Sequence, residues 1–254
     1  MTKNYSNALF VSDLHLMEDR PECIRAFFQF LKWIPEEIEA LFILGDFFEY
    51  WVGDDVDLPY STEVADALAE TSRRKSITIY FLPGNRDFAI GKAYCDRAHM
   101  ILLEADEVPL IIAKHRVLLS HGDLYCTDDK KYLMFRRIIR HPWVLKMLRS
   151  LSKKRRIKIA ETLRAASKNK YQRHPIPIDV TPEAIKQTLI KNKCDILVHG
   201  HTHLADIHLD LQNQENAQSP RRMVLGDWHH YGWYGKIDQN GPTLHRFTVD
   251  NPVF

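Results

Sequence analysis

Five short apolar segments of this chain are each followed at once by polar side chains that could bind metal ions. The polar motifs come in one order: Asp-Leu-His, Gly-Asp, Gly-Asn-Arg-Asp, His-Gly-Asp and Gly-His-Thr-His. They contain seven potential ligands, namely Asp13, His15, Asp46, Asn85, His121, His201 and His203. Burying several carboxylates and imidazoles together costs several kcal/mol for each group unless something compensates. The joint pattern therefore predicts a metal site.

Each motif alone is weak evidence. An Asp-x-His pair occurs again at Asp206 and at Asp227, and such a residue taken singly is usually a surface group or a satisfied hydrogen-bonding group. The unbroken order of all seven side chains is what favours the metal interpretation. His199, which also precedes His201, is not counted as a ligand, because at an alternating strand end it would face away from His201 and His203.

The ligand types narrow the choice of metal and reaction. No thiolate is among them, which argues against soft metals and structural zinc. Aspartate, asparagine and neutral histidine suit Mn²⁺, Fe²⁺, Zn²⁺ or Mg²⁺, and the number of imidazoles weighs against Mg²⁺. Seven ligands are too many for one catalytic ion with an open position, but they suit two ions about 3.5–4 Å apart that share a carboxylate. Such a pair activates water and predicts hydrolysis at phosphorus.

Two of the ligands are assigned a catalytic role as well. Asp46 is the expected bridge between the two ions, because its strand should lie centrally and no second ligand follows two residues later. His121 is the other residue that we assign to catalysis. Competing phosphate sites are disfavoured: no Gly-x-Gly-x-x-Gly motif occurs, and Ala93 stands where a phosphate-binding loop needs serine or threonine.

The segments that must position these side chains alternate between strand and helix. Amphipathic stretches at 21–34 and 61–69 separate the first three apolar segments, an order typical of a parallel α/β layer. Ligands in such layers gather at the carboxyl ends of the strands. Asn240-Gly241 predicts a hairpin near the carboxyl end of the chain. The five predicted strands are 8–12, 41–44, 77–82, 117–120 and 196–198.

Composition excludes several classes of protein. The 254 residues are 45% hydrophobic and 27% charged, which is ordinary for a folded, soluble chain and not for a disordered one. No apolar run approaches the roughly 20 residues of a membrane-spanning helix, and the first residues leave no room for a signal peptide, so we expect a cytoplasmic location. Four cysteines lie far apart without a Cys-x-x-Cys pair and are expected to be reduced and buried.

Basic residues are concentrated in one part of the chain. Sixteen of the 35 Lys and Arg residues lie within 130–173, together with a single acidic residue, Glu161. Apolar residues alternate with these cations at spacings that predict short amphipathic helices. We therefore expect a helical cap, 130–174, to be inserted into a core made of 1–129 and 175–254. Its apolar faces could simply pack on the core, with the cations as a solvated surface.

The motifs also carry a family resemblance. Asp-Leu-His, Gly-Asp-Phe-Phe-Glu, Gly-Asn-Arg-Asp, His-Gly-Asp and Gly-His-Thr-His in this order resemble the calcineurin-like metallophosphoesterases, whose core is a β-sandwich flanked by helices. Three further strings, at 51–55, 121–129 and 225–228, are similar to the members of this family that act on UDP-2,3-diacylglucosamine in lipid A biosynthesis. The resemblance covers essentially the whole chain. The predicted fold class is thus a mixed α/β (α+β) protein with that core and an inserted cap.

The resemblance implies a ligand set and a reaction. One metal ion would be held by Asp13, His15, Asp46 and His203, and the second by Asp46, Asn85, His121 and His201. The usual ion would be Mn²⁺. The reaction would be attack by water on the α-phosphorus of the pyrophosphate in UDP-2,3-diacylglucosamine, a lipid-linked UDP-sugar. The products would be UMP and 2,3-diacylglucosamine 1-phosphate.

Substrate contacts are predicted less sharply. Besides Asn85 and His201, the neighbouring Arg86 could clamp a phosphate oxygen, although a surface ion pair with Asp87 is an alternative. By the resemblance Asp129 would contact the glucosamine head, but it could instead cap the first cap helix. Ser167 stands where the family has a substrate-binding serine. A one-residue length difference after it leaves open which of Lys170, Tyr171, Arg173 and His174 makes the later contacts. Trp51 could equally be a core residue.

The cap suggests partners as well. Its apolar side could receive acyl chains, and its basic rim could meet phosphates and an anionic membrane surface, which would place the protein peripherally on the cytoplasmic face of the inner membrane. No obligate protein partner is predicted. Nucleic acid is not expected, because the cap is rich in Leu, Ile and Met and not in aromatic platforms for bases.

Two other classes of protein compete with this function. One is another two-metal phosphoesterase, such as a nuclease or a cyclic-nucleotide or protein phosphatase, since a basic cap could also bind a polynucleotide backbone. The other is a non-catalytic scaffold on the same fold. A scaffold would be expected to have lost ligands, whereas all seven are present here.

Overall fold

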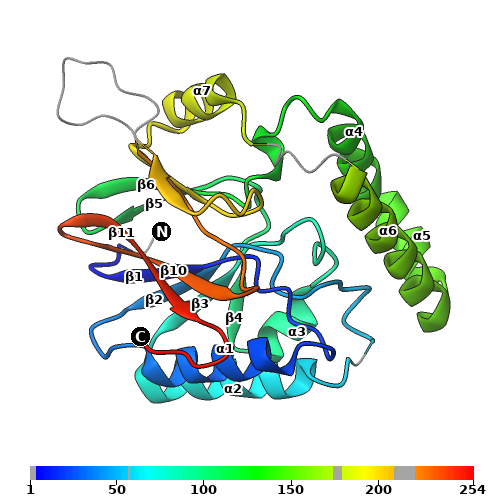
Figure 1. The fold of residues 1–254 in the computed structure, drawn as a ribbon, viewed down its shortest axis with the longest axis horizontal. Helices are drawn as coiled ribbons and strands as arrows, with labels where there is room; N and C mark the ends of the chain where they lie inside the picture. Colours follow the sequence, from blue (N-terminus) through cyan, green and yellow to red (C-terminus); the bar gives the residue numbers. More distant parts are fainter. Residues whose placement is uncertain (1–3, 57, 174–178, 209–220) are drawn as a thin grey trace.

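Two β-sheets lie face to face between layers of helices (Figure 1). The computed structural model describes residues 4–56, 58–173, 179–208 and 221–254, and for residues 166–173 it describes the backbone alone. In Figure 1, α1 and α2 cover one sheet from below, α7 covers the other from above, and α4, α5 and α6 stand together at one side. This arrangement agrees with the predicted mixed α/β sandwich.

The larger sheet has six strands in the order β11-β10-β1-β2-β3-β4, and the smaller has five in the order β5-β6-β7-β9-β8. In the first sheet β1 to β4 are parallel, and β10 and β11 form an antiparallel hairpin that pairs with β1. The strands are β1 (Ala8–Val11), β2 (Ala40–Ile43), β3 (Thr78–Phe81), β4 (Met100–Leu102), β5 (Val108–Ile112), β6 (His115–Leu119), β7 (Ile196–His199), β8 (Asp206–His208), β9 (Arg221–Val224), β10 (Tyr231–Asp238) and β11 (Gly241–Thr248).

Seven α-helices occur in the described residues. The first, α1, begins with a proline, which suits the first turn of a helix because the missing N–H would have no partner there. Their bounds are α1 (Pro21–Trp33), α2 (Ser61–Lys75), α3 (Lys92–Arg97), α4 (Lys130–Ile139), α5 (Pro142–Ser150), α6 (Lys153–Arg173) and α7 (Pro182–Asn192), and a short 3₁₀ helix, η1, spans Asp123–Tyr125. None of these helices is long and apolar enough to cross a bilayer.

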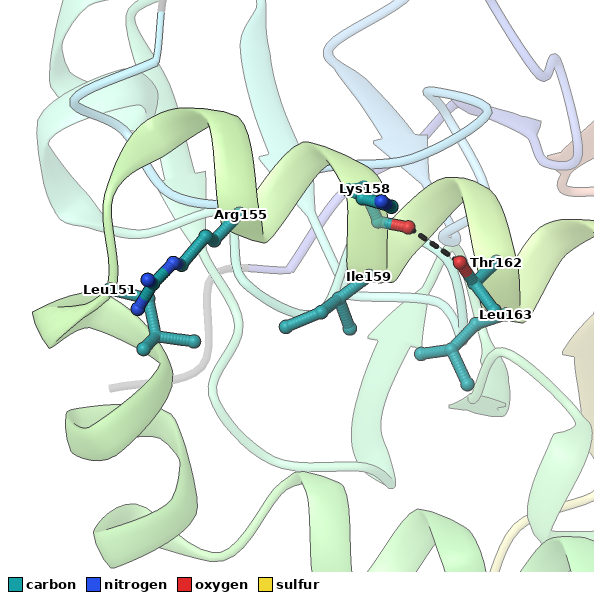
Figure 2. A pocket seen from close by; sticks show the side chains of 6 residues that line it. All are labelled: Leu151, Arg155, Lys158, Ile159, Thr162 and Leu163. Atoms are coloured by element: carbon teal, nitrogen blue, oxygen red, sulfur yellow. Dashed lines mark hydrogen bonds between the residues drawn. The ribbon is translucent and has the colours of Figure 1, made fainter.

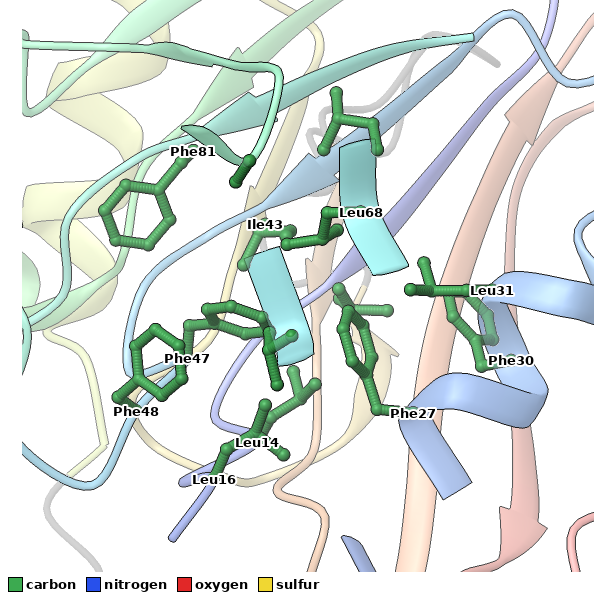
Figure 3. Packing of buried hydrophobic residues seen from close by; sticks show 14 of the residues in the cluster. Leu14, Leu16, Phe27, Phe30, Leu31, Ile43, Phe47, Phe48, Leu68 and Phe81 are labelled. Carbon is green, nitrogen blue, oxygen red and sulfur yellow. The ribbon is translucent and has the colours of Figure 1, made fainter. Parts of the chain in front are cut away.

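Alternate side chains of the central strands pack into two different hydrophobic cores. Along β1, Leu9 and Val11 face α1 and α2, whereas Ala8 and Phe10 face the second sheet. Because both faces of the strand are covered, all of its residues are apolar, and polar residues do not alternate with them. On the helical side, Phe27 and Phe30 of α1 pack with Ile43, Phe47 and Phe81 in one cluster (Figure 3). Each such buried side chain contributes about 1.5–3 kcal/mol.

The predicted elements occur where the sequence pattern placed them, with small shifts at their ends. All five predicted strands are present as β1, β2, β3, β6 and β7, and the hairpin around Asn240-Gly241 joins β10 to β11. The structure adds that β6 and β7 belong to the second sheet. The helix predicted over 61–69 is longer than expected and ends only at Lys75, where Ser76 adopts a left-handed conformation. As expected, β2 is an inner strand between β1 and β3.

We call helices α4, α5 and α6 the cap helices. They occupy most of the segment predicted as an inserted cap, and Pro142 stands in the first turn of α5 as predicted. The four cysteines are buried and form no disulfide bonds, which agrees with the expectation of reduced thiols. Trp51 is 4% exposed and packs in the core, where its ring lies 4.5 Å from that of Tyr94 between centroids.

Candidate metal centre

The backbone at the ends of three strands is held in an unusual conformation. Asp13 and His15 follow β1, and Asp46 follows β2, with φ angles of 56°, 49° and 50°. After β7, His201 and His203 have φ angles of 68° and 58°. A left-handed conformation is uncommon for residues other than glycine and is concentrated at functional sites. Five of the seven predicted ligands share it.

Two glycines allow the strand ends to approach each other this closely. A Cβ on Gly84 would come within 2.2 Å of the Asp46 backbone nitrogen, and one on Gly200 within 2.1 Å of Asp13 Oδ2. The loops are joined directly by backbone hydrogen bonds, since the amide of Asp13 donates to the carbonyl of Gly45 at 3.0 Å, and the amide of His15 donates to that of Asp46 at 3.0 Å. Any larger residue would separate them.

All seven predicted ligands lie in one connected cluster. Donor atoms of Asp13, His15 and His203 come within 4.8 Å of one another, and so do donor atoms of Asp13, Asp46 and His121. His203 Nε2 lies 3.3 Å from Asp13 Oδ1, and His121 Nε2 lies 3.6 Å from Asp46 Oδ1.

Asn85 connects the remaining two histidines to this cluster. Its Oδ1 is 2.9 Å from His121 Nε2 and 2.8 Å from His201 Nδ1. The amide of His201 donates to Asp13 Oδ2 at 2.9 Å. The two groups of side chains therefore share one site, formed by loops that follow strands of both sheets. Which of these residues bind metal remains a prediction.

The chemistry of the donor atoms fits divalent cations. Asp13 and Asp46 are buried, at 0% and 2% exposure, although both are carboxylates. Asp13 Oδ1 and both ring nitrogens of His15 are buried and have no hydrogen-bond partner in the described structure. An unpartnered buried oxygen and imidazole nitrogen that face the same cluster are costly unless a cation binds them. The residues present therefore fit the metal ions implied by the sequence.

Electrostatic coupling within the cluster is strong. Burial alone would raise the pKa of Asp13, but the neighbouring His203 outweighs it and the pKa is lowered. Conversely, burial would lower the pKa of His203, but Asp13 outweighs it and raises the pKa to about 9. For His201, burial and the nearby His121 together lower the pKa to about 4. In this structure His203 supplies the positive charge beside the Asp13 carboxylate, a role that a bound divalent cation could take over.

Several imidazole rings are oriented by a second group. His15 Nδ1 lies 3.3 Å from Glu49 Oε2, and His203 Nδ1 lies 3.6 Å from Asp227 Oδ2. His121 Nδ1 contacts the carbonyl oxygen of Leu44 at 2.8 Å. In metal sites such partners fix the ring orientation and leave the other nitrogen for the metal. The sequence analysis missed Glu49 and Asp227, although both stand inside quoted motifs.

Asp87 has a role different from the alternative considered for it. It is fully buried and is not a surface partner of Arg86. Its carboxylate accepts hydrogen bonds from the amides of Gly84 at 2.8 Å and Phe47 at 2.7 Å. Burial, and then the charge of Asp46, raise the pKa of Asp87 to about 6. Asp87 therefore holds the loop of Asp46 against the loop of Asn85.

Arg86 contacts Asp46 and Glu49 at the edge of the cluster, and its role as a phosphate clamp stays a prediction. Its Nη1 donates to Glu49 Oε1 at 2.6 Å, and its Nε lies 3.6 Å from Asp46 Oδ2. Its amide also donates to Asp46 Oδ1 at 2.9 Å. The side chain is 28% exposed, so part of the guanidinium remains open to solvent.

The first cap helix, α4, extends over the other side of the cluster. Tyr132 stacks on His201 with 6.0 Å between ring centroids and donates its hydroxyl to Asp123 Oδ2 at 2.5 Å. Arg136 Nε donates to the same oxygen at 2.6 Å. Asp129 Oδ1 accepts a hydrogen bond from the Tyr132 amide at 3.1 Å and so caps α4, which is the alternative raised for it. Sequence reasoning missed Tyr132 and Asp123.

The remaining residues that were predicted to contact the substrate lie partly outside the residues that the structure describes. Ser167, Lys170, Tyr171 and Arg173 lie in the last turns of α6, where only the backbone is described, and His174 lies outside the described residues. His199 is fully buried, and its Nδ1 contacts the carbonyl oxygen of Gly200 at 2.8 Å. Burial lowers the pKa of His199 to about 3.

Comparison with known proteins assigns the family. The chain belongs to the calcineurin-like phosphoesterases, whose sequence pattern matches residues 7–205. Curated relatives narrow the assignment. The UDP-2,3-diacylglucosamine hydrolase of Stutzerimonas stutzeri (strain A1501) is 44% identical over 234 residues, 92% of this chain and 95% of its own length. That of Azotobacter vinelandii (strain DJ / ATCC BAA-1303) is 40% identical over 243 residues, 95% of this chain and 99% of its own.

Proposed function

We propose that this chain hydrolyses the pyrophosphate of UDP-2,3-diacylglucosamine, giving UMP and 2,3-diacylglucosamine 1-phosphate. The observation that carries the proposal is the similarity, over more than nine-tenths of both chains, to proteins named for this hydrolysis. The geometry supports it, since two buried carboxylates, four histidines and an asparagine converge on one site. A nuclease or a protein phosphatase is not favoured by those relatives.

Two Mn²⁺ ions are the proposed cofactors. Asp13, His15, Asp46 and His203 would hold one, and Asp46, Asn85, His121 and His201 the other. Bound there, the ions would supply a water acidic enough to attack at neutral pH and would neutralise charge on the phosphoryl oxygens. The absence of thiolates and the mixture of carboxylate, amide and imidazole donors support Mn²⁺ over soft metals.

The chain's own groups orient the substrate. Arg86 presents an open part of its guanidinium beside Asn85, and a planar fork of donors matches two oxygens of a phosphate. Asp46 accepts a hydrogen bond from the backbone amide of Arg86, and this bond keeps Asp46 and Arg86 together. Tyr132, stacked on His201, would contact the substrate from the cap side of the site.

A groove on α6 is the proposed site for an acyl chain. It has a volume of about 430 Å³ and an apolar floor of Leu151, Ile159 and Leu163, which point to the same side of the cap helices (Figure 2). Arg155 and Lys158 line it as well. Each methylene buried there would contribute about 0.8 kcal/mol, so one chain could add several kcal/mol of binding.

Exposed apolar side chains among the cations of α4 and α5 support peripheral binding to an anionic membrane, on the cytoplasmic face of the inner membrane. Trp143 is 74% exposed, Met134 65% and Met147 59%. Indole rings favour the interface between lipid and water. Each Lys or Arg near an anionic surface contributes about 1 kcal/mol.

One assay tests the reaction. Wild-type protein loaded with Mn²⁺ is expected to release UMP from UDP-2,3-diacylglucosamine and to leave single-stranded DNA uncut. Asp13→Asn serves as the inactive control, because it keeps the size of a buried side chain and removes its charge. Cleavage of DNA without release of UMP would contradict the proposal.

Membrane binding is tested separately by sedimentation with vesicles of phosphatidylglycerol and phosphatidylethanolamine. Trp143→Ser should reduce the bound fraction several-fold at fixed salt. Tyr231→Ser is the matched control, since it removes an aromatic ring that is 44% exposed on β10. Equal binding by the two variants would contradict a role of the cap helices in membrane attachment.

A further inference from the structure

Glu49 contacts three groups that serve different parts of the site. Its Oε1 accepts a hydrogen bond from Arg86 Nη1 at 2.6 Å, and it forms an ion pair with Arg164 of α6, whose Nε lies 2.6 Å away. Its Oε2 lies 3.3 Å from Nδ1 of His15. One carboxylate thus connects a predicted metal ligand, the predicted phosphate clamp and a cap helix.

The position of Glu49 is fixed by its backbone. Its amide donates to the carbonyl of Leu16 at 3.1 Å, and Leu16 pairs with Phe48 in an isolated parallel bridge. The Glu49 side chain is 10% exposed, whereas Arg86 and Arg164 are 28% and 37% exposed, so only the carboxylate end of these ion pairs is shielded from water. A carboxylate held this firmly can hold a ring in one orientation.

We propose that Glu49 is a positioning residue that orients His15 for metal binding and links this orientation to the cap through Arg164. The inference rests on the proposed two-metal function. His15 Nδ1 lies 3.3 Å from Glu49 Oε2 as a charged contact and not as a hydrogen bond, and Nε2 is buried without a hydrogen-bond partner, so it is available to a metal ion. Arg164 neutralises the buried carboxylate and keeps its oxygens in place, so that docking of α6 completes the site.

The neighbouring arginine of α6 provides the contrast. Arg156 pairs with Asp55, and in the described part of the chain neither residue forms a hydrogen bond or ion pair with a predicted metal ligand. Asp55→Asn therefore disturbs the attachment of the same helix without touching His15. It is the matched control for Glu49→Gln, which keeps the size of the side chain and removes the charge.

The test is Mn²⁺ affinity measured by calorimetry on the metal-free full chain, with thermal unfolding recorded for each variant. Glu49→Gln should weaken binding by about 10–100-fold, as losing an outer partner of a metal-bound histidine typically does. Arg164→Met should weaken it about 2–5-fold, but should have no further effect once Glu49→Gln is present, because the two residues act through one contact. Asp55→Asn should stay within about twofold of wild type.

Three results would each contradict one part of this proposal. Affinity of Glu49→Gln within twofold of wild type would overturn the positioning role, and additive effects of the two variants would overturn the link to the cap. If Glu49→Gln does not fold, Glu49→Asp replaces it, because the shortened side chain withdraws the carboxylate from His15 and should give the same loss. Wild-type protein that binds no Mn²⁺ would overturn the proposed function as well, so the two failures are distinguishable.

Discussion

Arg156 of α6 lies directly against Gly53 in the loop that follows β2. A Cβ on Gly53 would come 2.6 Å from Arg156 Nη1, and the same nitrogen donates to the carbonyl of Val52 at 2.6 Å. Asp54 closes the other side of this loop by accepting from Trp51 Nε1 at 3.0 Å. Residues 51–55 thereby form a contact site for α6, the longest cap helix.

Gly53→Ala should destabilise the protein by displacing this arginine. The residue has φ +125°, which alone costs about 1–3 kcal/mol for an alanine. Gly241→Ala is the control: it has φ +104°, but the nearest atom would be 3.3 Å away. Urea unfolding should show about 1 kcal/mol more loss for Gly53→Ala, since the partly buried hydrogen bond from Arg156 to the Val52 carbonyl is broken too. Equal losses would show that Arg156 is not held by this loop.

Asp46→Asn should abolish turnover and leave the fold intact. Asparagine tolerates the left-handed conformation that Asp46 adopts and can still accept from the Arg86 amide. The loss of a bridging charge should lower kcat by about 10³-fold and reduce the bound Mn²⁺ per chain. Activity and metal content are measured on the same sample. Near wild-type activity would refute the bridging role.

Asp87→Ala should destabilise the metal-free protein without removing a ligand. The amides of Gly84 and Phe47 would lose their acceptor, at about 1–3 kcal/mol for each buried group. Asp96→Ala is the control, because its pair with Lys92 is exposed on α3 and should contribute less than about 0.5 kcal/mol. Both are compared by urea unfolding, and a similar small loss in the two would contradict the structural role of Asp87.

Buried thiols should not react in the native protein. Burial raises the pKa of Cys23 to about 11 and that of Cys95 to about 12, so both remain protonated at pH 8. Because the thiolate is the reactive form, a disulfide reagent should modify none of the four cysteines rapidly at pH 8 and all four in guanidinium chloride. Rapid reaction of a cysteine in the folded chain would contradict the burial.

The sequence pattern was sufficient to predict the strands and the cluster of polar side chains that follow them. Each strand is a short apolar run, and Asp13 and Asp46 come directly after two such runs, so their convergence follows from parallel pairing alone. Local pattern does not specify pairing partners. For this reason the separation of β6 and β7 into a second sheet was not predicted.

The partners of the ligands could not be predicted for a similar reason. Glu49 and Asp227 are separated in sequence from the histidines they contact, and a single acidic residue is usually a surface group. The same holds for Tyr132, whose place over His201 depends on how α4 is attached to the core. Arg86 was expected to face either phosphate or Asp87, and its actual partner, Glu49, depends on the turn after β2.

Strand β1 has a consequence for how the chain folds during synthesis. Ala8 pairs with Ala40 on one side and with Ile237 on the other. One edge of this apolar strand therefore stays open until β10 has left the ribosome, and open edges invite pairing with other chains. The nascent protein should depend on chaperones until β10 closes the sheet.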